Sequence, residues 1–87
     1  MTSREGVLAW VSAERDRQGA KWGHAHAWGY GDCSSDAVPD SVKAAVLAEE
    51  CGEVAQAVLD RKPDDLRTEL IQVAAVAVAW LEGLTDR

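Results

Sequence analysis

The stretch from Leu70 to Leu81 constrains the fold of this chain most strongly, because only Gln72 interrupts its apolar residues. A helix that is apolar on nearly every side has to be surrounded by other elements. The stretch is well short of the ~20 residues that a bilayer span needs, so we expect no membrane partner. A chain of 87 residues buries only about 60% of its unfolded surface and can hardly enclose this helix alone. We therefore expect a homodimer or homotetramer that completes a four-helix-type core.

The rest of the pattern predicts a single all-α domain, a short helical bundle that covers residues 1–87. Apolar residues recur with a helical period in three segments. Between the first two segments, from residue 19 to residue 40, several glycines, Pro39 and a Cys-Ser-Ser-Asp run predict a long irregular loop. The expected helices span about residues 3–18, 41–60 and 64–84.

Local signals mark the ends of these helices. Thr2 and Glu5 have the spacing of a capping box, which would open the first helix. Asp40 or Ser41 is expected to cap the second helix. The connection formed by residues 61–64 is short, so the second and third helices should be antiparallel neighbours.

Three glutamates of the second helix stand where buried residues are expected. At about 100° per residue, Glu49, Glu50 and Glu53 fall within or beside the arc of its valines, whereas Lys43 falls outside the centre of that arc. Gly52 lowers helix propensity inside this segment, which suggests close helix packing there. Carboxylates that face away from water need a cation.

The third helix repeats this arrangement. Glu69 starts its apolar row, and Gln72 flanks it one turn further on. An antiparallel neighbour brings Glu69 towards the acids of the second helix, so one ion can be shared between the two helices. Mg²⁺ prefers oxygen ligands of this kind, and Mn²⁺ is the alternative ion.

Charge and cysteine content exclude other classes of function. The chain has 15 acidic and 9 basic residues and a net charge of -6, which opposes binding to nucleic acid. Cys33 and Cys51 lack CxxC spacing, and the Met1 end lacks the pattern of a secretory signal. We therefore expect free thiols and a cytoplasmic setting.

The acidic motif also resembles that of a known family. EExxE followed by ExxD on the next helix is the signature of the MazG-like all-α nucleoside triphosphate pyrophosphohydrolases, which include the dimeric dUTPases. Here the motif reads Glu49-Glu50-Cys51-Gly52-Glu53 and then Glu69-Leu70-Ile71-Gln72, and the stretch from Arg17 to Gly23 is similar to small, phage-type members. The resemblance covers about residues 14–84. Gln72 departs from the family pattern, which has aspartate there.

The resemblance implies hydrolysis of a nucleoside triphosphate, ribo or deoxy, to its monophosphate and pyrophosphate with Mg²⁺. Glu50, Glu53 and Glu69 would then be metal ligands, and Gln72 a weaker, uncharged ligand. Glu49 and Glu53 would be the catalytic acids, with Glu49 holding a second ion or orienting the attacking water.

Basic and aromatic residues are the candidates for substrate contacts. A triphosphate is seldom neutralised by metal alone, and basic side chains on helices are otherwise solvated surface charges. Aromatic residues of the loop can stack on a base, or they can pin the loop as a small core. The basic candidates are Arg17, Lys21 and Arg67, and the aromatic ones are Trp22, Trp28 and Tyr30.

Two alternatives remain open at this point. His24 and His26 could bind zinc, but because no further Cys or His except Cys33 stands at a supporting spacing, we favour a hydrogen-bonding role in the loop. Gln72 motivates the second alternative, a catalytically lapsed helical module that binds nucleotide or a protein partner.

Overall fold

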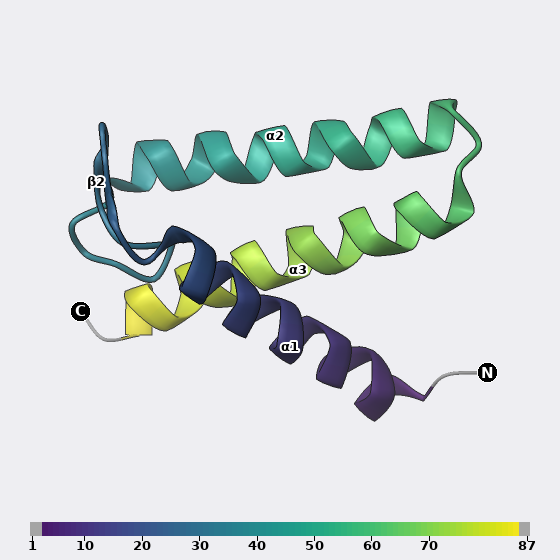
Figure 1. The fold of residues 1–87 in the computed structure, drawn as a ribbon, viewed down its shortest axis with the longest axis horizontal. Coiled ribbons are helices and arrows are strands. Elements are labelled where there is room, and N and C mark those ends of the chain that lie inside the picture. Colours follow the sequence, from purple (N-terminus) through teal and green to yellow (C-terminus); the bar gives the residue numbers. More distant parts are fainter. Residues whose placement is uncertain (1–2, 86–87) are drawn as a thin grey trace.

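The computed structural model describes residues 3–85 and has three helices and a two-stranded hairpin in this part of the chain (Figure 1). This confirms the expected all-α bundle. In chain order, the elements are α1 (Arg4–Trp22), β1 (Ala25–His26), β2 (Gly29–Tyr30), α2 (Asp40–Leu59) and α3 (Pro63–Thr85).

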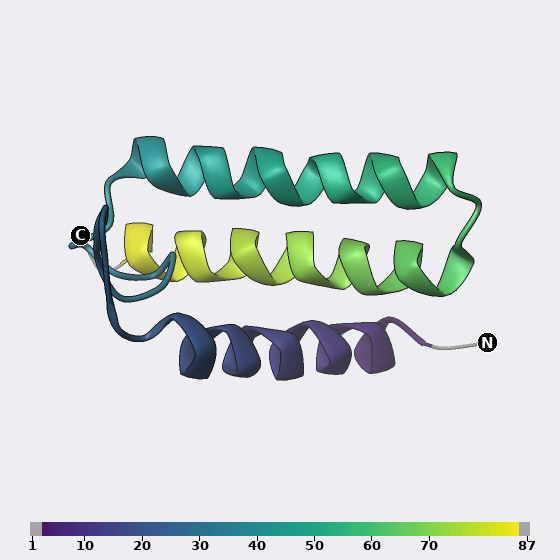
Figure 2. The same cartoon turned by 45° about the horizontal axis from the view of Figure 1, so that its top comes forward.

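Helix α3 is the centre of the molecule. It packs against α1 and against α2, while α1 and α2 make no close backbone approach to each other within residues 3–85 (Figure 2). Small buried residues of α3, Ala75, Ala79 and Gly83, let its neighbours come close. Val11 of α1 and Ala57 of α2 complete this narrow core from the two sides.

The first helix differs from expectation at both ends. Ser3 is its N-cap, with Oγ accepting a hydrogen bond from the Gly6 amide at 3.1 Å, whereas the expected cap Thr2 lies outside the described residues. The helix also continues to Trp22, beyond the expected end at residue 18. A glycine lowers the stability of a helix by about 1 kcal/mol but does not have to end it, so α1 continues through Gly19.

The connecting segment is correspondingly shorter and contains the hairpin. Ala25 pairs with Tyr30, and His26 pairs with Gly29. Gly29 has φ 142°, and a Cβ placed there would stand 2.0 Å from the Ala37 carbonyl oxygen, so only glycine fits. His24 and His26 both hydrogen-bond to backbone carbonyl oxygens at 3.0 Å, which is the role we favoured for them.

The link between α2 and α3 is tight, as expected. Pro39 precedes α2 without a side-chain cap bond, so neither Asp40 nor Ser41 acts as the expected cap. At the far end Arg61 adopts φ 55°, and the next helix begins at Pro63, whose missing N–H is tolerated in a first turn. The chain thus reverses within a few residues and sets α2 antiparallel to α3 (Figure 1).

Lys43 is completely buried, which contradicts its expected place outside the apolar arc. Its ammonium nitrogen has no hydrogen-bond partner within the described residues. The loop before α2 explains the difference. Val38 of this loop is buried, and Cys33 lies close enough for its thiol to interact electrostatically with Lys43. Helical phase describes one helix at a time and cannot show that the loop leading into the helix folds over it.

A second surface of α3 is apolar and exposed. Leu70, Val78, Leu81 and Leu84 are all exposed, and a hollow lies between Leu47 of α2 and the last turns of α3. By length and composition, α3 is the one helix among residues 3–85 that could also cross a membrane. Since α3 supplies half of the buried hydrophobic residues of the described chain, its place in this structure is that of a core helix which its own chain only partly covers.

The glycines at 83 and 52 predict stability changes of opposite sign. A Cβ at Gly83 would stand 2.7 Å from the Ser34 carbonyl oxygen, whereas a Cβ at Gly52 would meet nothing within 4 Å, which contradicts the close packing expected there. Gly83→Ala should lower the free energy of unfolding by about 1–3 kcal/mol. Gly52→Ala should raise it by about 0.5–1 kcal/mol, since alanine is the better helix former.

Urea unfolding of the two variants beside the native protein measures both changes. A destabilised Gly52→Ala variant would contradict an open surface at that turn of α2.

Candidate metal centre

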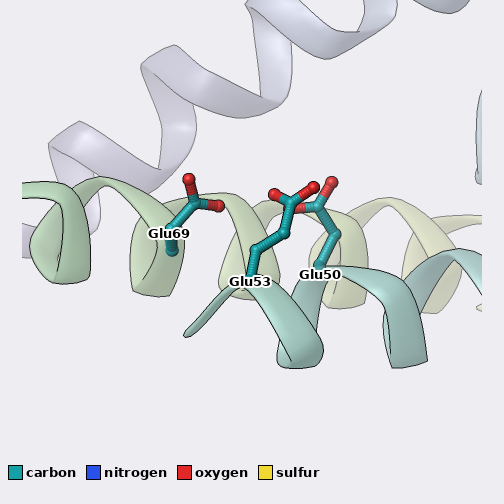
Figure 3. A group of neighbouring side chains, drawn as sticks. All are labelled: Glu50, Glu53 and Glu69. Atoms are coloured by element: carbon teal, nitrogen blue, oxygen red, sulfur yellow. The ribbon is translucent and has the colours of Figure 1, made fainter. Parts of the chain in front are cut away.

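Three carboxylates from two helices converge on one point. Glu50 and Glu53 of α2 and Glu69 of α3 each offer a ligand oxygen, and these oxygens lie within 4.8 Å of one another. Figure 3 shows the three side chains turned towards the same side of the α2–α3 pair. The sequence predicted that these acids would meet, and the structure brings them together.

Backbone geometry explains this convergence. Glu50 and Glu53 are three residues apart, so they share one face of α2. Glu69 lies in the second turn of α3, which runs antiparallel to α2 after the tight link at Arg61. Neither helix needs an irregular turn to present its carboxylates.

The pKa values of two of these acids are raised, first by burial and then by the neighbouring carboxylates. Burial raises the pKa of Glu69 to about 7, and a hydrogen bond with Glu53 and the charges of Glu53 and Glu50 add to the effect. Burial is also the largest cause of the raised pKa of Glu50, followed by the charges of Glu53 and Glu49. Like charges brought this close disfavour ionisation, so the group holds a proton more tightly than separate carboxyls do.

The Gln72 amide lies across two of the carboxylates. One of its terminal atoms stands 3.2 Å from Glu50 Oε2 and 2.9 Å from Glu69 Oε2. Without a bound cation, this atom is assigned as Nε2, because an amide nitrogen donates hydrogen bonds and carboxylate oxygens accept them. With a cation among the carboxylates, rotation of the amide would present its oxygen instead.

The donor set fits a hard divalent cation. Three carboxylates and one amide oxygen are ligands of the kind that Mg²⁺ and Mn²⁺ bind, and Mg²⁺ keeps free positions for water and phosphate. Glu53 is exposed and Glu50 and Glu69 are only partly buried, so an ion could reach the site from solvent.

A cavity adjoins this acidic cluster. It measures about 150 Å³ and includes Glu49 and Glu50 in its wall. Its aromatic side is formed by Trp22, His26 and Trp28, with His26 stacked on Trp28 at a centroid distance of 4.7 Å. The remaining lining residues are Gln18, Gly31, Asp32, Cys33, Val38, Val46 and Val76.

The basic residues predicted to contact substrate do not line this cavity. Arg17 makes a two-pronged contact with Glu14 at 2.6 and 2.7 Å. Lys21 places its ammonium nitrogen 5.0 Å from the Trp22 ring centroid. Arg67 lies on the exposed first turns of α3, 3.8 Å from Asp64. Trp22, a candidate for stacking on a base, lies in the cavity wall.

Two further residues of the site were missed in the sequence. Gln18 is buried, and its Nε2 donates to the Gln72 backbone oxygen at 3.3 Å, which ties α1 to α3 beside the acidic cluster. Asp32 lines the cavity and pairs with Arg15 at 2.9 Å. Gln18 belongs to the stretch that resembles phage-type proteins, which was a usable signal, whereas Asp32 had none.

Comparisons of the chain with protein-family models, curated proteins and solved structures give no match. The likeness to a hydrolase family therefore rests on the motif residues themselves.

The raised pKa of Glu69 predicts how stability depends on pH without divalent ions. The folded state binds this proton more tightly than the unfolded state, whose pKa is near the usual 4.5. The contribution to stability is therefore complete below about pH 4.5 and is lost as the pH rises through about 7. We expect the thermal midpoint to fall across this interval in EDTA and to fall less steeply in Glu69→Gln.

Two lowered carboxyl pKa values do not disturb this test. Those of Glu14, paired with Arg17, and of Asp32, bonded to Ser34 and Arg15, fall below the usual values. Their contributions are lost only as the pH falls through these lowered pKa values. Equal slopes for the native protein and Glu69→Gln between pH 5 and 8 would contradict the assignment.

Proposed function

We propose that this protein is a Mg²⁺-dependent nucleoside triphosphate pyrophosphohydrolase, which converts a ribo- or deoxynucleoside triphosphate to its monophosphate and pyrophosphate. One observation carries the proposal: three carboxylates within 4.8 Å of one another adjoin a cavity with aromatic walls. A metal site beside a ring-sized cavity suits a ligand that joins a polyphosphate to a flat base. The motif resemblance supports the same reaction.

The side chains divide the task in this proposal. Glu50, Glu53 and Glu69 would hold the cation, with the Gln72 amide oxygen as a weaker fourth ligand. When bound, Mg²⁺ supplies charge neutralisation of the triphosphate and lowers the pKa of a coordinated water. Glu49 is exposed at the cavity wall, where its carboxylate can orient a water and accept its proton.

The acidic cluster has to lose its shared proton before it binds the cation. The pKa of Glu69, about 7, means that this carboxyl is half protonated near neutrality without an ion. Trp22 and Trp28 would stack on the base. The phosphates would be met by Lys21, Arg17 and Arg67, of which Arg17 has to leave Glu14 to do so.

A homodimer or homotetramer belongs to the same proposal. The exposed leucines of α3 and the apolar hollow beside Leu47 offer the surface that a second copy would cover. Such packing would enclose α3 in the way its composition demands.

The amide of Gln72 favours one other candidate, a catalytically lapsed module that binds nucleotide or a protein partner. Donating to both Glu50 and Glu69, this amide satisfies the carboxylates without any ion. The family pattern has an aspartate at this position, which could not do so.

Glu53→Gln tests the proposed reaction. The change removes one ligand charge and keeps the side-chain volume, so we expect kcat/KM to fall by on the order of 100-fold or more. Pyrophosphate release from a panel of nucleoside triphosphates, with Mg²⁺ and with Mn²⁺, is the measurement. Glu5→Gln, the same change on the exposed first turn of α1, should leave the rate unaltered. If the native protein releases no pyrophosphate from any nucleotide with either ion, the proposed reaction is wrong.

Gln72→Asp separates the enzyme from the lapsed module. A fourth carboxylate should tighten Mg²⁺ binding by roughly tenfold and thereby enlarge the thermal shift at a given Mg²⁺ concentration. Gln72→Ala is the control, because it removes the amide without adding a charge. Turnover that occurs only in Gln72→Asp, with nucleotide binding in both proteins, would assign the native chain to the lapsed class.

A further inference from the structure

The cavity beside the acidic cluster has the size of a single ring. Its volume is about 150 Å³. A cavity of about this volume accommodates one benzene-sized molecule. A six-membered ring therefore fits this space more closely than the fused rings of a purine do.

The aromatic side of the cavity provides a flat surface for such a ring. His26 and Trp28 lie almost parallel, at an interplanar angle of 3°, and Trp22 stands next to His26 at a centroid distance of 5.5 Å. Flat π faces bind any base and do not distinguish one pyrimidine from another. Discrimination has to come from the polar groups of the wall.

Three of those polar groups are carboxylates, which lie beside Gln18, His26 and Cys33. The carboxylates of Asp32, Glu49 and Glu50 all line the cavity, and among residues 3–85 no lysine or arginine does. Ionised carboxylates only accept hydrogen bonds. Because Glu50 is assigned to the cation and Glu49 to the water, Asp32 is the carboxylate left to favour a ring that offers an N–H group over one that offers a carbonyl oxygen.

Asp32 is the most firmly held of these acceptors. Its Oδ1 accepts from the Ser34 amide at 2.9 Å and from the Ser34 hydroxyl at 2.5 Å, and its Oδ2 accepts from Arg15 Nη1 at 2.9 Å. A carboxylate has about four acceptor positions, so one position on Oδ2 is left for a ligand. Only 13% of this side chain is exposed, so its direction is fixed before any ligand arrives.

The charge state of Asp32 supports the same role. Burial alone would raise its pKa, but the hydrogen bonds from Ser34 and the charge of Arg15 outweigh burial and lower the pKa below its usual value. The group is thus an ionised acceptor at neutral pH.

We infer that this cavity selects a pyrimidine with an exocyclic amino group, and hence cytosine nucleotides, with Asp32 accepting a hydrogen bond from that amino group. The inference rests on the proposed function of the same site. Uracil and thymine carry a carbonyl oxygen at this ring position, which would set one acceptor against another. Asp32 is in this sense a specificity residue and takes no part in the hydrolysis.

The test compares kcat/KM of the full chain with Mg²⁺ for dCTP, dUTP, dTTP, dATP and dGTP. We expect dCTP to exceed dUTP by roughly 10- to 100-fold, because an unmatched buried acceptor is costly. Equal values for dCTP and dUTP, or a dATP value as high as that for dCTP, overturn the inference and leave the proposed hydrolysis intact.

Asp32→Asn shows whether this carboxylate is responsible. An amide can donate to a carbonyl oxygen, so the ratio of dCTP to dUTP should fall towards one. Asp16→Asn, the same change on an exposed position of α1, should leave the ratio unaltered. A merely structural effect of losing the Arg15 contact would lower both values together, and an unchanged ratio in Asp32→Asn would therefore overturn the role of Asp32.

A binding measurement keeps the inference testable if no nucleotide is hydrolysed. Quenching of tryptophan fluorescence by dCMP, dUMP and dAMP in EDTA reports on Trp22 and Trp28 without metal or turnover. Tighter binding of dCMP by about tenfold or more supports the inference even where the proposed reaction has failed. Equal binding of dCMP and dUMP overturns it.

Discussion

The close approach of like charges between α2 and α3 is the constraint on which this structure depends. Packing of the two helices through small residues brings Glu50, Glu53 and Glu69 together, although each carboxylate would be better solvated apart. A raised pKa, near 7 for Glu69, and the bridging amide of Gln72 relieve part of the repulsion. The helix packing therefore stores an electrostatic penalty that a bound cation would remove.

The segment between α1 and α2 supplies much of the cavity wall beside the acidic cluster. Close backbone contacts fix its course, since Gly29 lies under the Ala37 carbonyl and Gly83 of α3 lies under that of Ser34. The Arg15 contact with Asp32 and Glu82 then joins α1, the segment and α3 through one guanidinium group. A loop with few regular hydrogen bonds is thereby held in place over the α2 N-terminus.

Features that depend on a single helix could be predicted from the sequence, and features that depend on where the loop lies could not. The common face of Glu50 and Glu53 follows from 3.6 residues per turn, and the short link fixes which helices meet, although Glu53 is exposed and not buried as its phase predicted. Lys43 was assigned wrongly because its burial results from the course of the segment just before α2, which the helical phase of α2 does not show. The same applies to Asp32, whose place in the cavity depends on the course of that segment.

Glu50 belongs both to the acidic cluster and to the wall of the cavity. One carboxylate would thus serve two neighbouring binding events. Thermodynamic linkage makes the coupling between the two binding events reciprocal. The factor by which the ion changes the affinity for the ring equals the factor by which the ring changes the affinity for the ion. The two halves of the site would therefore fill as a coupled pair, and a ligand lacking either its base or its phosphates would be held less well than the sum of its contacts suggests.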